Sequence, residues 1–233
     1  MIDWAHEARR IRSAYAQIPQ THRARWAALH PAERRHRVRQ YEALLELLAR
    51  TGWSDLAGKR VLDVGCAEGR LLGLMLDLGA LPQHLAGVEV RPEVLQKAQE
   101  RFLGSDLRLV EGPPWPFAEV SFDLILLSLV FSSVASQEAR AELAREVLRL
   151  LRPGGYLWWW DMPHQSLIAG GHGRPLNPLR LWPDLKPQAL YWGAPRWRSP
   201  IWTGRRMIRL LEGAWNVWFR WVPWVGVLLG PKP

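Results

Sequence analysis

Between residues 61 and 161, short apolar runs alternate with segments of helical periodicity, and this alternation restricts the chain to few folds. The runs typical of buried strands are VLDVG at 61–65, LAGVEV at 85–90, LRLVEG at 107–112, FDLILLS at 122–128 and YLWWWDM at 156–162. Helical segments at 69–79, 91–102 and 136–155 separate most of these runs. Such an order favours βαβ units in a mainly parallel sheet, whose ligands bind at the carboxyl ends of the strands.

The two ends of the chain differ from this central part. Residues 31–51 are expected to be helical, since Tyr41, Leu44, Leu45 and Leu48 share one helical face. After Asp161 the chain becomes rich in Pro, Gly and Trp, and eleven of the fifteen tryptophans lie at or beyond residue 158. Helical spacing returns near residues 204–221, and WVGVLLG at 224–230 is typical of a last strand.

The charge is unevenly placed. The net charge of +9 divides into +5 for residues 1–50, −4 for residues 51–161 and +8 for residues 162–233. Basic flanks of this kind suit nucleic acid, anionic lipid or an anionic substrate, and they are equally typical of a solvated surface. The single cysteine, Cys66, excludes an internal disulfide, and neither a signal peptide nor a 20-residue apolar span is evident, which favours a cytoplasmic location.

The stretch VLDVGCAEGR at 61–70 predicts a strand, a glycine turn and the start of a helix. A dinucleotide-binding turn would show G-x-G-x-x-G, whereas here the spacing is Gly65-x-x-x-Gly69 and the glycine that admits a pyrophosphate is absent. The carboxylates Asp63 and Glu68 disfavour a phosphate. Glu89, which ends the second run, can accept two hydrogen bonds from vicinal hydroxyls. A polar, hydroxyl-rich and cationic ligand is therefore expected.

Four motifs in this order resemble the class I S-adenosylmethionine-dependent methyltransferases. They are VLDVGCAEGR at 61–70, GVEVRPE at 87–93, SFDLILLSLVFSSV at 121–134 and VLRLLRPGGYLWWWD at 147–161. The resemblance implies an α/β fold with a doubly wound, mainly parallel seven-stranded sheet, helices on both faces and an antiparallel last strand. Residues 1–52 would add an N-terminal helical extension. Residues 53–233 would form the methyltransferase domain, with 163–224 as a Trp-rich cap on the substrate side and 224–230 as the last strand.

The resemblance also implies the cofactor, S-adenosyl-L-methionine, and the residues that hold it. Around the methionine and ribose these are Asp63, Gly65, Cys66, Ala67, Gly69, Glu89, Val90 and Ser128. Members of the family often have an Asp after the third strand that accepts from the adenine amino group, and this chain has LVEGPPWPF there, with Glu111 displaced. Gly112 and Pro113 are instead expected to hold adenine through the backbone, with Trp115 free to stack. No metal is expected, because no metal-ligand spacing accompanies the motifs.

On the acceptor side, His164 and Asp161 are the candidate bases for a hydroxyl acceptor, although an amine acceptor would need none. Phe131, Ser132 and Trp160 are the candidate substrate-binding residues. Residues 1–50 and 163–224 are expected to form the acceptor pocket and its lid, which suits a small-molecule, glycan or lipid-linked acceptor. Arg205, Arg206 and Arg209 beside Trp215 and Trp218 also suit peripheral contact with an anionic membrane, and the tryptophans equally suit simple packing of the tail.

Two other classes compete with this interpretation. A nucleic-acid methyltransferase would fit the basic flanks, but neither an N/D-P-P-Y/F motif nor a recognition module is evident. A non-catalytic protein that binds S-adenosylmethionine would be favoured by degraded glycine or Glu89 positions, and these are intact. The sequence does not identify the acceptor or the oligomeric state.

Overall fold

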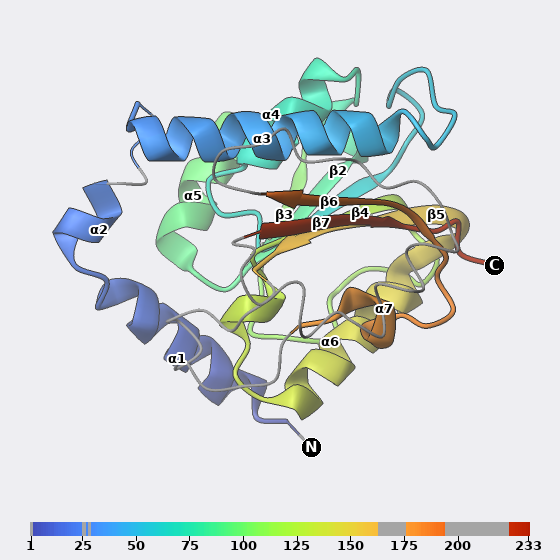
Figure 1. The fold of residues 1–233 in the computed structure, drawn as a ribbon. Coiled ribbons are helices and arrows are strands. Elements are labelled where there is room, and N and C mark those ends of the chain that lie inside the picture. The colour runs from blue at the N-terminus through green and yellow to red at the C-terminus, as the bar shows by residue number, and fades with distance from the viewer. Residues whose placement is uncertain (1, 25–26, 28, 163–175, 194–223) are drawn as a thin grey trace.

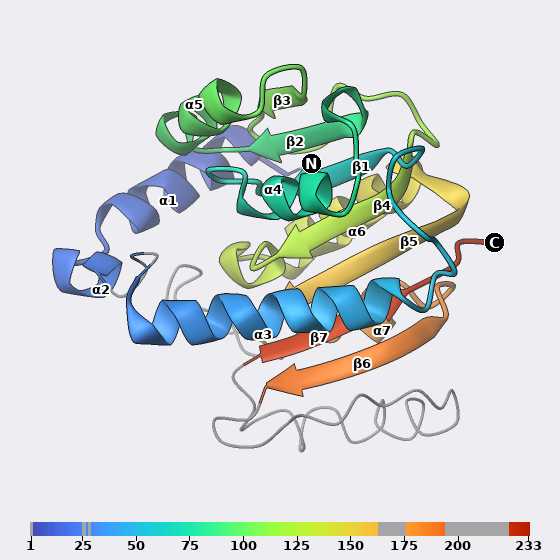
Figure 2. The ribbon, with the colours of Figure 1, turned by 90° about the horizontal axis from the view of Figure 1, so that it is seen from above.

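The computed structural model describes residues 2–24, 27, 29–162, 176–193 and 224–233. Its centre is one seven-stranded sheet in the order β3-β2-β1-β4-β5-β7-β6 (Figures 1 and 2). The strands are β1 (Val61–Val64), β2 (Leu85–Glu89), β3 (Asp106–Leu109), β4 (Phe122–Ser128), β5 (Leu151–Asp161), β6 (Pro187–Gly193) and β7 (Trp224–Leu229). The doubly wound fold class expected from the motifs is thus confirmed.

The direction of the strands fixes where a ligand can bind. Strands β1 to β5 pair in parallel, whereas β7 is antiparallel to both β5 and β6, as expected for the last strand. The chain runs outward from β1 to β2 and β3, then returns to the other side of β1 as β4. The carboxyl ends of β1 and β4 therefore flank the point where the strand order reverses, the usual crevice of a doubly wound sheet.

Helices cover both faces of the sheet. The helices are α1 (Trp4–Ala16), α2 (Gln20–Ala24), α3 (Pro31–Leu48), α4 (Arg70–Asp77), α5 (Pro92–Arg101), α6 (Gln137–Leu150) and α7 (Pro178–Leu181), with 3-10 turns η1 (Pro82–His84) and η2 (Phe131–Ser133). Helices α3, α4 and α5 lie on one face, and α6 and α7 lie on the other, where α1 also lies beyond the strand ends (Figures 1 and 2). Each face buries its own apolar cluster.

The triple tryptophan of β5 shows how one strand serves both clusters. Trp159 packs on the α6 side, while Trp158 and Trp160 pack on the α3 side, as the period of two in a strand requires. All three side chains are fully buried, and the rings of Trp158 and Trp160 stack with centroids 6.0 Å apart. This strand is therefore anchored in the interior up to its carboxyl end.

The element bounds differ from the sequence-based expectation at three places. Helix α3 ends at Leu48, and α6 ends at Leu150, so that Pro153 and Gly154 lie in a bulged start of β5. Strand β6 falls in a stretch that lacks clear periodicity in the sequence. The expected helix at 204–221 and most of the expected cap at 163–224 lie outside the described residues.

Candidate functional site

The turn after β1 is held by backbone hydrogen bonds to the end of β2. The amides of Gly65 and Cys66 donate to the carbonyl of Val88 at 2.8 and 3.1 Å, and the amide of Ala67 donates to Glu89 Oε2 at 3.0 Å. These amides are therefore used inside the protein rather than offered to an anion. The finding agrees with a turn that does not bind phosphate.

Gly69 closes this turn in the left-handed conformation, with φ +78°, and directly precedes α4. A β-carbon at this position would overlap the ring of Phe102, which follows α5. Gly65 also has a positive φ, of +70°. The two glycines of the motif thus serve the tight turn and the close packing of α4 against the end of α5.

Two carboxylates lie beneath the turn. Asp63, in β1, is 2 % exposed, and burial raises its pKa to about 8; Arg70 opposes this shift and Glu89 adds to it. Glu89, at the end of β2, is 3 % exposed and lines a cavity at the carboxyl ends of the strands. The first carboxyl group is thus largely neutral at pH 7, and the second lies at the wall of the cavity.

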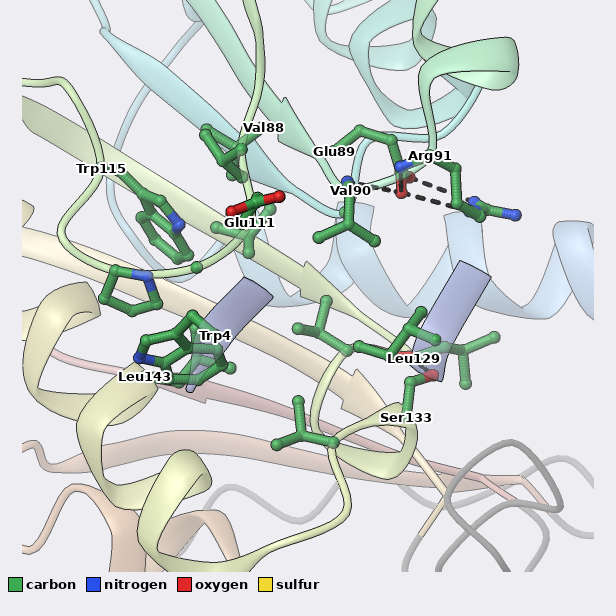
Figure 3. A pocket seen from close by; sticks show the side chains of 18 of the residues that line it. Trp4, Val88, Glu89, Val90, Arg91, Glu111, Trp115, Leu129, Ser133 and Leu143 are labelled. Atoms are coloured by element: carbon green, nitrogen blue, oxygen red, sulfur yellow. Dashed lines mark hydrogen bonds and ion pairs between the residues drawn. The ribbon is translucent and has the colours of Figure 1, made fainter. Parts of the chain in front are cut away.

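A cavity of about 110 Å³ opens at the switch point between β1 and β4 (Figure 3). Of the predicted cofactor residues, those that line it are Gly65, Glu89, Val90, Gly112, Pro113 and Ser128. Asp63, Cys66, Ala67 and Gly69 are not among the lining residues and instead build the turn and its support. The structure therefore brings one part of the predicted set to the cavity and places the other part behind it.

The side of this cavity where adenine is expected is mainly apolar. Val110, Pro113, Trp115 and Leu143 line it, and Trp115 is fixed by its amide, which donates to Glu146 Oε1 at 2.7 Å. The Glu111 side chain is 55 % exposed and lies 3.9 Å from the Arg12 guanidinium. The wall offers a flat apolar slot of the kind that accommodates a nucleobase.

Helix α1 contributes a wall that the sequence reasoning missed. Trp4, Ile11 and Tyr15 line the same cavity as Gly65 and Glu89. Trp4 also covers Gly112, where a β-carbon would overlap the indole. The expected acceptor lid at residues 1–50 thus begins with a helix that closes the side where adenosine is expected. The spacing 4, 11, 15, which repeats on one helical face, was the available signal.

Ser128, at the end of β4, also lines the cavity. Its hydroxyl accepts from Gln40 Nε2 at 2.8 Å, and Gln40, on α3, is fully buried. His36, one turn earlier on α3, lies with its ring centroid 6.0 Å from that of Trp160, and burial lowers its pKa to about 4. A neutral polar patch therefore borders the end of the site where the methionine portion is expected.

The predicted acceptor-side residues lie in the interior. Phe131 and Trp160 are fully buried; Phe131 packs on Trp182 and Trp160 packs on Trp158. Asp161 accepts from the amides of Ser132 and Met162 at 3.1 and 2.8 Å and joins η2 to the end of β5. None of these lines the cavity. Their packing explains their burial, and a role toward substrate stays a prediction.

Burial raises the pKa of Asp161 to about 6, against the hydrogen bonds from Ser132, Met162 and Phe131. The other candidate base, His164, lies outside the described residues. Among the described residues no group of His, Cys, Asp and Glu is placed to hold a metal ion, and the expectation of a metal-free site stays a prediction. No described helix is both long and apolar enough to cross a bilayer.

Comparison with known proteins places the central strands and helices in one family. Residues 62–159 match the family model described as "Methyltransferase domain". A Mycolicibacterium smegmatis protein named as a probable S-adenosylmethionine-dependent methyltransferase is 26% identical over 148 residues, which are 64% of this chain and 53% of that protein. The phthiotriol/phenolphthiotriol dimycocerosates methyltransferase of Mycobacterium tuberculosis is 33% identical over 129 residues, or 54% of this chain and 46% of that protein.

The chain spans about half the length of these curated relatives. Among solved structures, the N-methyltransferase NodS of Bradyrhizobium japonicum is similar with a TM-score of 0.60 and 15% identity, covering 84% of this chain and 97% of that one. The [4+2]-cyclase SpnF is similar with a TM-score of 0.57 and 18% identity, covering 83% of this chain and 81% of that one. Residues 62–159 therefore belong to a methyltransferase domain, and the chain has the fold of the class I S-adenosylmethionine-dependent methyltransferases.

Proposed function

We propose that this chain transfers the methyl group of S-adenosylmethionine to a small-molecule acceptor of lipid character. The observation that carries the proposal is the cavity at the β1–β4 switch point, where the buried carboxylate of Glu89 stands beside an apolar slot in a matched methyltransferase domain. The fold alone does not identify the reaction, because the chain is also similar in fold to a [4+2]-cyclase.

The residues around the cavity fit this cofactor. Glu89 offers carboxylate oxygens to vicinal ribose hydroxyls, and Val110, Pro113 and Leu143 offer flat apolar contact to adenine. The amides of the glycine turn are already bonded within the chain, so a pyrophosphate would find few donors. The Glu89 carboxylate at the cavity wall favours a ligand that carries positive charge, as a sulfonium does.

When bound, this cofactor supplies an electrophilic methyl group to an acceptor nucleophile. The residues of the chain align the two partners and exclude water. Glu89 holds the ribose, and Ser128, itself positioned by Gln40, faces the amino-acid end. Trp4, Ile11 and Tyr15 cover the adenosine side. A hydroxyl acceptor would in addition need a base, for which Asp161 and His164 stay the candidates.

The proposed acceptor class is supported by the relatives. The mycobacterial proteins with 31–33% identity are named as methyltransferases of phthiotriol/phenolphthiotriol dimycocerosates. The basic segments at 1–50 and 162–233 are compatible with an anionic lipid surface near such an acceptor. Peripheral membrane contact is part of this proposal, and nucleic acid is not.

The test is transfer of a radiolabelled methyl group from S-adenosylmethionine to lipid and aqueous extracts of bacterial cells. The wild-type chain is expected to label a species in the lipid extract. Glu89→Ala is expected to lose most of this activity, while Arg9→Ala, an exposed position on α1, retains it. Labelling confined to aqueous metabolites or nucleic acid would contradict the proposed acceptor, and absence of any transfer would contradict the proposed reaction.

A further inference from the structure

Glu89, the proposed ribose ligand, is already saturated by donors of its own chain. Oε1 accepts from the amides of Val90 and Arg91 at 2.9 and 3.0 Å and from Arg91 Nε at 3.2 Å. Oε2 accepts from the amide of Ala67 at 3.0 Å and from Arg91 Nη2 at 3.1 Å. Figure 3 shows the Arg91 guanidinium drawn against this carboxylate at the cavity wall.

A ribose would have to compete with these donors. A carboxylate offers about four lone-pair sites and Glu89 already accepts five hydrogen bonds, so ribose hydroxyls can approach it only where donors of the chain give way. The three backbone donors belong to the turn and to the start of α5, which are fixed by the sheet. The Arg91 guanidinium is carried by a flexible aliphatic chain, so it is the donor group that can move away from Glu89.

Helix α1 holds Arg91 in this position. The guanidinium carbon lies 4.1 Å from the centroid of the Tyr15 ring, within cation–π distance. Arg12, one turn before Tyr15, donates from Nε to the carbonyl of Val90 at 2.6 Å. The side chain of Arg91 is consequently only 16 % exposed. The same guanidinium therefore contacts Glu89 and α1 at once.

The same helix is tied to the opposite rim of the cavity. Arg10 Nη2 donates to the carbonyl of Ser133 at 2.6 Å, and Glu7 Oε1 accepts from the amide of Ala135 at 2.8 Å. Trp4 Nε1 donates to Glu142 Oε1 at 2.8 Å. Because α1 bridges the β2 rim and the α6 rim, it spans the mouth of the cavity.

The cavity is small for a whole cofactor molecule. Its 110 Å³ is below the roughly 300–1,000 Å³ of sites that hold drug-sized ligands. With α1 in this position, the described walls enclose space for only part of a nucleoside that carries an amino acid. Admission of the whole molecule requires that a wall move, and α1 is the wall held by side chains rather than by the sheet.

We propose that Arg91 and α1 form a gate on the cofactor site, in which Arg91 occupies the ribose acceptor Glu89 until the ligand displaces it. The inference rests on the proposed function, since it takes Glu89 as the ribose ligand. Release of Arg91 removes its contacts with Glu89 and Tyr15 together, which leaves Arg12 to hold α1 to the end of β2. Ligand binding and the position of α1 are thereby coupled.

The test measures binding of S-adenosylhomocysteine by calorimetry and by stopped-flow association, without methyl transfer. Arg91→Ala is expected to lower Kd by about fivefold or more and to raise the association rate, because the competing charge-assisted bonds are gone. Arg91→Lys, which cannot make the paired contact, should fall between Arg91→Ala and wild type. Arg9→Ala, exposed on α1, should match wild type in both quantities.

A second readout uses the protein without ligand. Amide hydrogen exchange over residues 4–16 is expected to be faster in Arg91→Ala and Tyr15→Ala than in wild type or Arg9→Ala. If wild type binds S-adenosylhomocysteine and Arg91→Ala binds it equally or more weakly, the gate is overturned and the proposed function stays intact. Wild type that does not bind S-adenosylhomocysteine would instead contradict the proposed function and the gate with it.

Discussion

At the scale of single residues, the site combines a carboxyl group kept neutral by burial with a second one that is bonded to five donors of its own chain. Asp63 lies one residue before the end of β1, and burial raises its pKa to about 8. Glu89 ends the adjacent β2 and accepts five hydrogen bonds. A cationic ligand placed beside both would favour ionisation of Asp63. Ligand affinity and the protonation of Asp63 should therefore be linked.

The raised pKa of Asp63 predicts how stability changes with pH. The folded chain holds this proton up to about pH 8, whereas the unfolded chain releases it near the ordinary aspartate pKa of 3.8. The folded state thus binds more protons between these values, and the free energy of unfolding falls as pH rises through them, by at most about 1.4 kcal/mol per pH unit from this group. Asp63→Asn should remove this slope and be the more stable variant at pH 8.

Urea unfolding of the ligand-free protein at pH 5, 6, 7 and 8 measures this effect. Asp77→Asn, at an exposed position on α4, serves as the control and should keep the wild-type slope. Equal slopes for Asp63→Asn and wild type would show that Asp63 is ionised in the folded protein at these pH values.

Gly69 predicts a loss of stability with two separable causes. In Gly69→Ala an alanine must adopt a left-handed backbone conformation with φ +78°, and its methyl group would overlap the ring of Phe102. Gly52→Ala has a nearly equal φ of +77° with nothing within 4 Å, so it carries the backbone cost of roughly 1–2 kcal/mol alone. Gly69→Ala should lose at least about 1 kcal/mol more in urea unfolding, the lower end of an overpacking cost. Equal losses would mean that Phe102 moves freely.

At the scale of elements, α1 is the part of the molecule whose role the sequence indicated least. Its apolar positions 4, 11 and 15 predict a helical face but not the surface that the face covers. The structure sets this face on the cavity of Glu89, beside Gly112 and Val110. An N-terminal segment expected to serve the acceptor therefore begins with a helix on the cavity proposed to hold adenosine.

Gly112→Ala tests the fit of α1 on this cavity. The added methyl group would overlap the Trp4 indole, which should displace the first turn of α1 and break its bond to Glu142. Dissociation of S-adenosylhomocysteine is expected to be several-fold faster, with faster amide exchange in residues 4–8. Gly58→Ala, which meets nothing within 4 Å, should behave as wild type. An unchanged dissociation rate in Gly112→Ala would contradict the covering role of Trp4.

At the scale of the whole molecule, the sequence predicted the part of the fold that repeats a simple pattern. The five apolar runs between 61 and 161 became β1 to β5, because buried parallel strands bounded by glycine and proline have a strong local signal. The antiparallel β7 was also expected, through the resemblance. Strand β6 was not, since its sequence PQALYWG shows no clear alternation.

The site was predictable only in part, for a related reason. Glu89 and the glycine turn are adjacent to strands in sequence, so their place at the strand ends follows from the fold. The contact of Arg91 with Tyr15 joins residues 76 positions apart and depends on where α1 folds back. Likewise, Phe131 and Trp160 were expected at the acceptor side. Their burial depends on packing against Trp182 and Trp158, which the sequence did not indicate.

A crystal structure of the chain with S-adenosylhomocysteine tests whether Glu89 holds the ribose. Both ribose hydroxyls are expected within about 2.6–3.2 Å of the Glu89 carboxylate, with adenine against Val110 and Pro113 and the Arg91 guanidinium withdrawn from Glu89. Adenosine bound elsewhere, or at this cavity with its ribose hydroxyls away from Glu89, would contradict this role of Glu89.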